Sequence, residues 1–237
     1  MCHAQTRSAW AWLFSAPYNV NVDYKPAYLI GGGRSVHRLD WDKIQKSGIF
    51  CMGIDHEAWL YVGDTVSQIV SIKADSLPLK LLQNQDLVKW LPENHGDRPI
   101  GKMRIRDLDN VRFFRMNANW FPEQFLESPT VSSGHAIGTA GGVHSSILPA
   151  LWILYEQRYR DVTLLGCDFD TEEPERDYWS KLNKLLTQLK PIFEARDFWI
   201  TNGSDSEGAL KAFRNEPSIT GKWLKKGTDA NESDGRT

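Results

Sequence analysis

The chain has 237 residues, of which 41% are hydrophobic, and a formal charge of -2. This length suffices for one domain with a substantial core, and we expect a single domain. The balanced charges, with no basic stripe, argue against a dedicated nucleic-acid-binding protein. Cys2, Cys51 and Cys167 are too widely spaced for a disulfide framework or a paired-thiol zinc site, which favours a reducing compartment.

Residues 1–25 form an aromatic segment whose apolar patch is too short for a signal peptide or a membrane span, so we expect a cytoplasmic protein. A buried strand is predicted at residues 26–30, directly before a glycine loop. Strand, loop and the helical pattern that follows are typical of a Rossmann-like unit, although the third glycine of the dinucleotide fingerprint is missing. The candidate phosphate contacts in this loop are Gly31, Gly32, Gly33, Arg34 and Ser35.

Two further strands are predicted at residues 48–55 and 68–75, and each ends in acidic residues. Open α/β sheets bind ligands outside the carboxyl ends of their strands. Gly53 and Asp55 are therefore candidates for nucleotide binding, and Asp75 for substrate binding. Residues 77–91 indicate a helix, and residues 92–109 a turn-rich loop or small insertion near the site.

Residues 111–120, VRFFRMNANW, interleave aromatic side chains with Arg115, Asn117 and Asn119. Stacking by the aromatic rings and hydrogen bonds from the polar groups suit recognition of a ring or a sugar. The three polar residues are therefore candidate substrate contacts. An edge strand followed by a turn explains the same pattern.

A second small-residue loop precedes an amphipathic helix and a buried strand that ends in Asp168 and Asp170. Backbone amides at a helix N-terminus bind anions, so this loop is the second candidate phosphate site. Pro149 predicts a helix start near Ser145 or Ser146, because proline is tolerated in the first turn, and the anion-facing amides then shift toward residues 145–148. Glycines that only permit a tight turn are the alternative. The candidate loop residues are Thr139, Ala140, Gly141 and Gly142.

Downstream, the pattern predicts a helix at residues 171–196 that Pro191 kinks or ends, then a strand at 198–201 and a short helix at 206–213. Residues 221–237 have the polar composition of a disordered tail. The alternation of strands and helices predicts an α/β fold over residues 26–220. We expect one Rossmann-like domain, with a mainly parallel sheet flanked by helices.

Two parts of this pattern together resemble known families. Strand-GGGRS near the start, followed by the small-residue loop, helix and VTLLGCDFD, is similar to the variant Rossmann fold of the bacterial sialyltransferase-like glycosyltransferases. It is equally similar to the 6-hydroxymethylpterin diphosphokinase-like proteins, many of them uncharacterised phage proteins. The chain departs from these families at Arg34, where they usually have Pro, and at Ala140, where they have Ser. The FRMN segment at residues 114–117 lies later in the chain than the sialyltransferase F-R-x-N segment.

The glycosyltransferase resemblance implies a nucleotide-activated sugar as donor, CMP-linked by analogy, and no required cofactor. The acceptor implied is a glycan, with nucleic acid left open, and both a monomer and a homo-oligomer remain open. His144, directly after the phosphate loop, is the first candidate base, since imidazole titrates in the required range. His135 is the second candidate, and Asp168 is a further candidate catalytic residue.

Two alternatives stay open. The diphosphokinase resemblance implies transfer from ATP with magnesium, bound by Asp168 and Asp170 with help from Asp55 and Asp75. The third possibility is a non-catalytic nucleotide-binding protein, which would keep the glycines and tolerate loss of His144. The carboxylate count favours the diphosphokinase, whereas the amides and aromatic rings at residues 111–120 favour sugar transfer.

Overall fold

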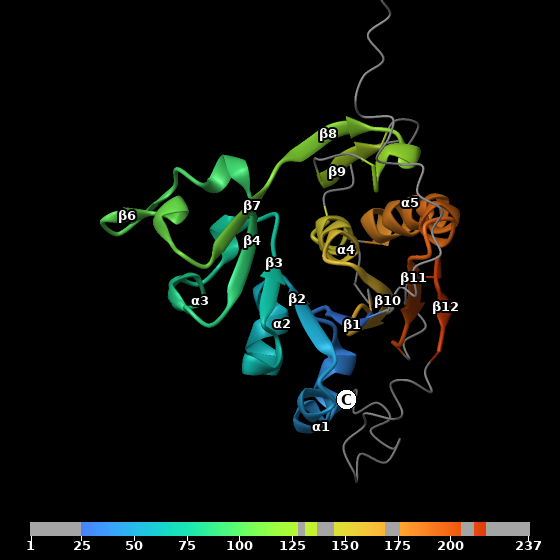
Figure 1. Ribbon diagram of the computed structural model, residues 1–237, viewed down its shortest axis with the longest axis horizontal. Helices are drawn as coiled ribbons and strands as arrows, with labels where there is room; N and C mark the ends of the chain where they lie inside the picture. The colour runs from blue at the N-terminus through green and yellow to red at the C-terminus, as the bar shows by residue number, and fades with distance from the viewer. Residues whose placement is uncertain (1–24, 128–130, 137–144, 169–175, 205–210, 217–237) are drawn as a thin grey trace, which may run out of the picture.

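The computed structural model describes residues 25–127, 131–136, 145–168, 176–204 and 211–216 (Figure 1). The aromatic N-terminal segment up to residue 24 and the predicted tail at 221–237 lie outside the described residues. So does most of the short helix predicted at 206–213. In the described part of the chain, no helix is both long and apolar enough to cross a membrane.

An eight-stranded, fully parallel sheet forms the centre of the described structure, with the order β12-β11-β10-β1-β2-β3-β4-β7. This confirms the predicted α/β class and the parallel sheet. The strands are β1 (Lys25–Ile30), β2 (Phe50–Ile54), β3 (Gln68–Val70), β4 (Val88–Pro92), β7 (Val111–Phe114), β10 (Tyr159–Leu165), β11 (Trp199–Asn202) and β12 (Arg214–Asn215).

Helices cover both faces of the sheet, because side chains of a buried parallel strand alternate between two cores. Ala27 and Leu29 of β1 pack into the core formed with α4 (Ile147–Glu156) and α5 (Arg176–Glu194). Tyr28 and Ile30 pack into the opposite core. The helices on that face are α1 (Trp41–Lys46), α2 (Asp55–Val62) and α3 (Leu79–Gln83).

Smaller elements complete the described chain. A hairpin, β5 (Pro99–Ile100) and β6 (Met103–Arg104), extends from the β4 and β7 side of the molecule, and β8 (Met116–Trp120) pairs in parallel with β9 (Val131–Ala136) (Figure 1). The 3-10 turns are η2 (Arg34–Arg38), η3 (Gly63–Thr65), η4 (Ala74–Ser76), η5 (Glu93–His95), η6 (Ile105–Asp107) and η7 (Pro122–Gln124).

The order of the strands creates a switch point at β1. Its two neighbours are β2, the next strand of the main sheet along the chain, and β10, which begins more than a hundred residues later. Ile30 pairs with Leu165 of β10 and with Gly53 of β2. The connections leave β1 in opposite directions, which opens a crevice at the carboxyl ends of the strands, where α/β proteins bind ligands.

The helix predicted over residues 77–91 is wrong for its second half. Asn84 accepts the N–H of Asp86 through its side-chain oxygen at 2.9 Å, and this turn ends α3 at Gln83. The alternating residues that follow form strand β4. The third predicted strand is also shorter than expected, because β3 ends at Val70.

The start of α4 agrees with the prediction from Pro149. The helix begins at Ile147, directly after Ser146, and Pro149 occupies its first turn. In α5, the helix continues through Pro191 and ends at Glu194, so Pro191 does not end the helix where it stands.

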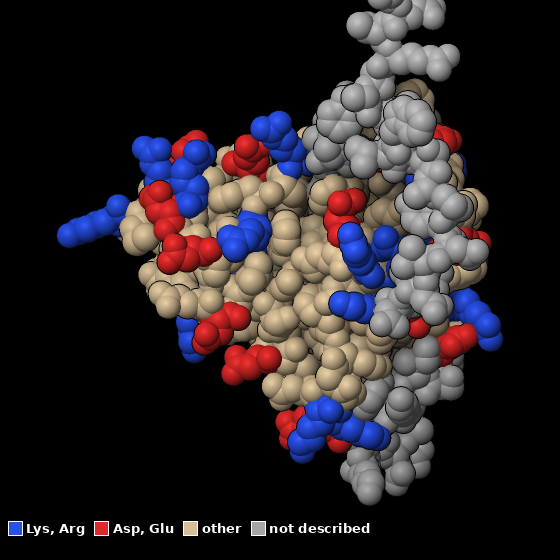
Figure 2. All heavy atoms as spheres, in the orientation of Figure 1, with Lys and Arg blue, Asp and Glu red and all other residues tan. Residues whose placement is uncertain are grey.

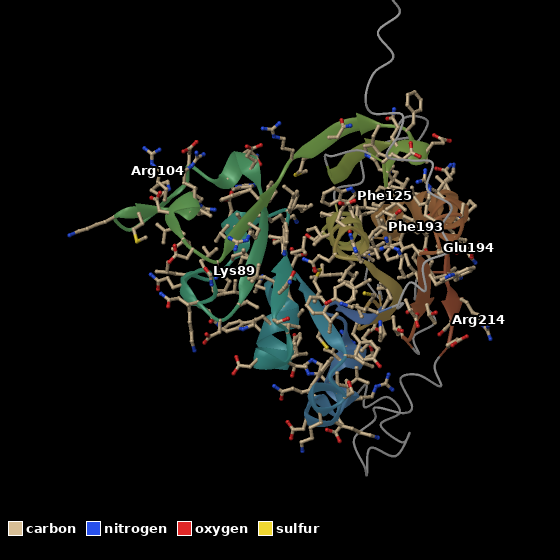
Figure 3. The ribbon with its side chains drawn as sticks, viewed as in Figure 1. Lys89, Arg104, Phe125, Phe193, Glu194 and Arg214 are labelled. Carbon is tan, nitrogen blue, oxygen red and sulfur yellow. The ribbon has the colours of Figure 1, made fainter. Side chains whose placement is uncertain are left out.

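Charged side chains on the face shown in Figure 2 are mixed in sign rather than gathered into one basic stripe. At the end of the molecule around β5 and β6, arginines pair with acidic residues, as Arg106 does with Asp97 at 2.8 Å. One cation is buried in the sheet: Lys89 of β4 has no exposed surface, and its Nζ donates to the Asn84 carbonyl at 2.6 Å (Figure 3).

Candidate functional site

A cavity of about 600 Å³ lies at the switch point, within the size range of small-molecule sites. It is formed by the segments that follow β1, β2, β3 and β10, together with the N-terminal ends of α4 and α5. Its lining residues are Gly31, Gly32, Gly33, Arg34, Ile54, Asp55, Glu57, Ile72, Lys73, Ser145, Ser146, Ile147, Gly166, Cys167, Asp168, Tyr178 and Trp179.

The first glycine loop packs directly against the backbone that follows β10. The N–H groups of Gly31 and Gly33 donate to the carbonyls of Leu165 and Gly166, both at 2.8 Å. A Cβ atom at Gly31 would lie 2.5 Å from the Gly166 oxygen, and one at Gly33 would lie 2.6 Å from the same atom. Glycine is therefore required here for close packing of backbone on backbone.

Asp168 connects this loop to the end of β10 through hydrogen bonds. Its Oδ2 accepts the Ser35 N–H at 2.6 Å, and its Oδ1 accepts the Ser35 hydroxyl at 2.6 Å. The Ser204 hydroxyl, after β11, donates to the same Oδ1. With three donors on a carboxylate that is 3% exposed, Asp168 acts as the joint between three segments of the sheet edge.

The backbone N–H groups of Gly32 and Ser146, on the cavity wall, have no intramolecular partner within the described residues. Gly32 belongs to the glycine loop, and Ser146 directly precedes α4. The next amide, that of Ile147, donates to the Ser145 hydroxyl at 3.3 Å. Free amides in a loop and at a helix N-terminus are suitable donors for an anion such as phosphate.

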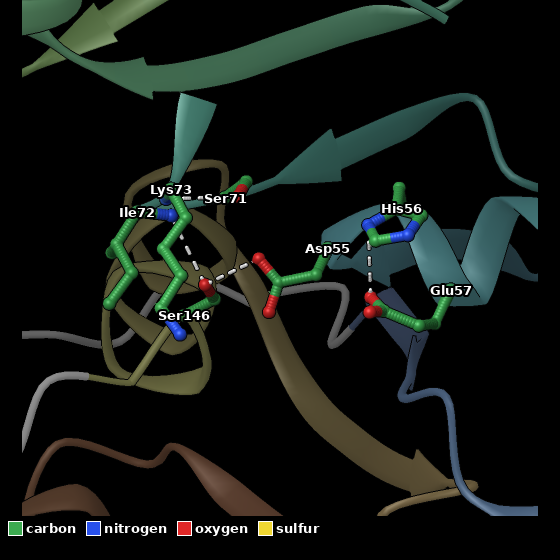
Figure 4. Close-up of polar contacts among 7 residues, drawn as sticks. All are labelled: Asp55, His56, Glu57, Ser71, Ile72, Lys73 and Ser146. Atoms are coloured by element: carbon green, nitrogen blue, oxygen red, sulfur yellow. Dashed lines mark hydrogen bonds and ion pairs between the residues drawn. The ribbon is translucent and has the colours of Figure 1, made fainter. Parts of the chain in front are cut away.

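Asp55 lies at the first position of α2 and enters the cavity between β2 and β3 (Figure 4). The Ser146 hydroxyl donates to Asp55 Oδ1 at 2.8 Å and accepts the Ile72 N–H at 3.1 Å. Burial raises the pKa of the Asp55 carboxyl above its usual value, while hydrogen bonds from Ser71 and Ser146 act in the opposite direction.

The remaining wall combines cations, a second carboxylate and aromatic rings. Arg34 and Lys73 are exposed at the cavity, and so is Glu57, whose carboxylate lies 3.3 Å from Nδ1 of His56. Tyr178 and Trp179, in the first turn of α5, form an edge-to-face pair with centroids 4.7 Å apart. The cavity therefore offers both signs of charge together with an apolar surface.

Cys167 also lines the cavity, but its thiol is 2% exposed and its pKa is raised to about 12, mainly by burial. A thiol that stays protonated at neutral pH is a poor nucleophile. Cys51 is likewise buried and free, with its pKa raised to about 12. Neither cysteine carries chemistry at this site.

The structure brings six of the sequence-predicted residues to the cavity wall: Gly31, Gly32, Gly33, Arg34, Asp55 and Asp168. Ser35 lies just behind the wall, bonded to Asp168. Gly53 is buried in β2 beneath α2, where a Cβ atom would lie 3.2 Å from Ala58 Cβ.

Other predicted contacts lie elsewhere. Asp75 is 71% exposed and pairs with Arg98, and Arg115 is 73% exposed and pairs with Glu93 at 2.8 Å. None of the residues at 92–109, expected near the site, belongs to the cavity wall. Asn117 and Asn119 are in β8, where Asn119 is in register with His135 of β9.

The second small-residue loop, Thr139 to Gly142, lies outside the described residues, as do His144 and Asp170. The expected anion site is represented in the structure only by its far end, Ser145 to Ile147. In the described part of the chain, no three His, Cys, Asp or Glu side chains are grouped so as to hold a metal ion. Of the magnesium ligands expected for a diphosphokinase, Asp55 and Asp168 line the cavity, Asp75 pairs with Arg98, and Asp170 lies outside the described residues.

The sequence did not point to Lys73 or Glu57 as site residues, and it placed Ser146 only among the anion-facing amides at the start of the helix, not beside Asp55. Ser146 meets Asp55 across 91 positions of sequence, which no local pattern reveals. Lys73 follows the third strand, but the expected strand ran on to Asp75 and placed the wrong residue at the sheet edge. Knowing where β3 ends would have been enough to find Lys73.

Comparison with known proteins adds no identification. The chain matches no protein-family model, no curated protein and no solved structure.

Proposed function

We propose that this chain is a glycosyltransferase-like enzyme that binds a nucleotide-activated sugar in the cavity at the switch point. The supporting observation is that the cavity wall combines amide donors and cations with carboxylates. Free amides of Gly32 and Ser146, with the cations Arg34 and Lys73, suit a phosphate group. The carboxylates of Asp55 and Glu57 suit a group that carries hydroxyls or positive charge.

Glycosyl transfer requires both kinds of surface. The bond between the anomeric carbon and the phosphate oxygen breaks, and the phosphate leaves with the electron pair. The sugar ring becomes cationic as the oxygen of an acceptor hydroxyl approaches, and a base removes the hydroxyl proton. Amides and cations stabilise the leaving phosphate, and carboxylates stabilise the ring. His144 and His135 remain the predicted bases, and a glycan remains the predicted acceptor.

Tyr178 and Trp179 support the same proposal, because a base or a sugar ring stacks on aromatic side chains at low entropic cost. They are partly buried and line the cavity at the start of α5. A nucleotide spanning the cavity would therefore meet an apolar surface as well as donors.

The test is a thermal-shift panel of CMP, UDP, GDP, ATP and the matching sugar nucleotides, each with and without magnesium. The variants are Lys73→Ala and, as a control, Lys80→Ala, an exposed lysine of α3 away from the cavity. We expect a rise in Tm of a few degrees with a sugar nucleotide, independent of magnesium and at least halved by Lys73→Ala only.

A shift that occurs only with ATP and magnesium would replace this proposal by phosphoryl transfer. No shift with any member of the panel would contradict a nucleotide site altogether.

A further inference from the structure

The backbone of Asp55 is held in an unusual conformation. Its φ is 59°, in the left-handed region that side chains other than glycine rarely adopt. Arg158 and Asp197, the other such residues in the described chain, follow the ends of α4 and α5, where this conformation closes a helix. Asp55 instead begins a helix. No helix-capping need explains its conformation, and strain of this kind concentrates at binding sites.

The hydrogen bonds around Asp55 have a fixed direction. The Ser146 oxygen accepts the Ile72 N–H at 3.1 Å, and the Ser71 oxygen accepts the Lys73 N–H at 3.1 Å. Since a backbone N–H can only donate, each serine oxygen is engaged as an acceptor. Each hydroxyl proton is thereby left to donate to Asp55, as Figure 4 shows for Ser146 at 2.8 Å.

This arrangement prepares Asp55 as an acceptor. The two serine hydroxyls occupy part of the carboxylate, and Asp55 presents its other lone pairs in a cavity that it lines. A ligand atom placed against it must carry a hydrogen to donate. Phosphate oxygens at neutral pH are acceptors and carry negative charge, so this position repels them. A sugar hydroxyl meets the requirement.

We propose that Asp55 binds a hydroxyl group of the sugar portion of the nucleotide substrate, and that the phosphate lies instead against the glycine loop, at Gly32 and Arg34. This inference rests on the proposed function and assigns the orientation of the ligand within it. The shared chemistry is a sugar hydroxyl, which either the ribose or the transferred sugar can supply.

The test is calorimetric titration of the full chain with two sets of ligands. CMP and UDP are compared with their 2′-deoxy and 3′-deoxy forms, and UDP-glucose with its 2-deoxyglucose counterpart. The quantity measured is the ratio of the Kd of the deoxy ligand to the Kd of the complete ligand. In the set that contains the hydroxyl bound by Asp55, this ratio should be about ten or more for the wild type, because the deoxy ligand loses a hydrogen bond to a charged group. The set that responds identifies the sugar.

Asp55→Asn should bring this ratio close to one, and asparagine also tolerates the left-handed conformation. Asp64→Asn, an exposed carboxylate just beyond α2 and outside the cavity wall, is the matched control and should keep the ratio. Ser146→Ala removes one of the two holding hydroxyls and should lower the ratio by about threefold. If Asp55→Asn does not fold, the ratio measured for Ser146→Ala tests the inference in its place.

A ratio near one in the wild type, or an unchanged ratio in both Asp55→Asn and Ser146→Ala, would overturn this inference while nucleotide binding stands. Failure of every nucleotide to bind would overturn it together with the proposed function.

Discussion

At the scale of single residues, the structure places two charged groups where solvent hardly reaches them, with different consequences. Asp168 is buried with three donors, so its charge is compensated. Lys89 is fully buried, and its Nζ makes its hydrogen bond to a neutral carbonyl, that of Asn84. A buried ammonium without an opposite charge is costly, and burial lowers the pKa of Lys89 to about 8.

Lys89→Met should therefore stabilise the chain at neutral pH, by about 1–3 kcal/mol. The Asn84 carbonyl keeps a donor, because the Asn110 side chain also bonds to it. The pKa of Lys89 is about 8 in the folded chain and 10.5 in the unfolded chain. The charged lysine therefore lowers the free energy of unfolding by its full amount below pH 8. This destabilisation disappears as the pH rises from 8 toward 10.5, because Lys89 loses its proton in the folded chain.

Urea unfolding of wild type and Lys89→Met at pH 7 and pH 10 measures this effect. We expect the gain in unfolding free energy to shrink at pH 10, while Lys80→Met, at an exposed position, should show no such trend. An equal gain at both pH values would show that packing rather than charge is responsible.

Residue-scale reasoning from the sequence located part of the site. The glycine loop and Asp168 stand out because they follow short apolar strands, and strand ends meet at one edge of a parallel sheet. Lys73 was missed because the expected third strand ran past it to Asp75. The contact of Ser146 with Asp55 forms only when α4 is brought against the end of β2, which is a property of tertiary structure.

At the scale of elements, local chemistry settled where helices begin better than where they end. Pro149 predicted the start of α4 because proline costs a helix least in its first turn. Residues 77–91 have apolar residues on both sides of the polar run at 83–86, where one side-chain hydrogen bond of Asn84 forms the turn that ends the helix. In α5, packing of Leu189 and Phe193 into the core carries the helix past Pro191.

Pro191→Ala should stabilise α5. Proline has no N–H to donate to the Thr187 carbonyl four residues earlier, and position 191 is exposed, so the substitution leaves no cavity. We expect a gain of about 1–3 kcal/mol in the free energy of unfolding, from chemical denaturation. Lys190→Ala, at the adjacent position, should change stability by less than about 0.5 kcal/mol. A loss of stability in Pro191→Ala would mean that the chain needs proline at this point.

At the scale of the whole molecule, the centre of the sheet is completed late in the chain. β1 lies between β2 and β10, and the core on the α4 and α5 side receives Ala27, Leu29 and Met52 from the first half of the chain. A fragment without β10, α4 and α5 would expose those side chains on an open sheet face.

A chain truncated after residue 127 should therefore lack a cooperative thermal transition and bind a hydrophobic dye. Truncation after residue 216, which keeps every described element, should preserve the transition of the full chain. A cooperative transition in the shorter fragment would show that the α1 to α3 side folds independently.

The contact between the glycine loop and the end of β10 also limits how this protein can evolve. A methyl group at Gly32 would lie 2.5 Å from Glu57 Cβ, an atom that is absent only if position 57 also becomes glycine. At Gly33 it would meet the carbonyl oxygen of Gly166, which no substitution removes. Descendants of this chain can therefore change position 32 only together with a change of Glu57 to glycine, whereas no such pair opens position 33.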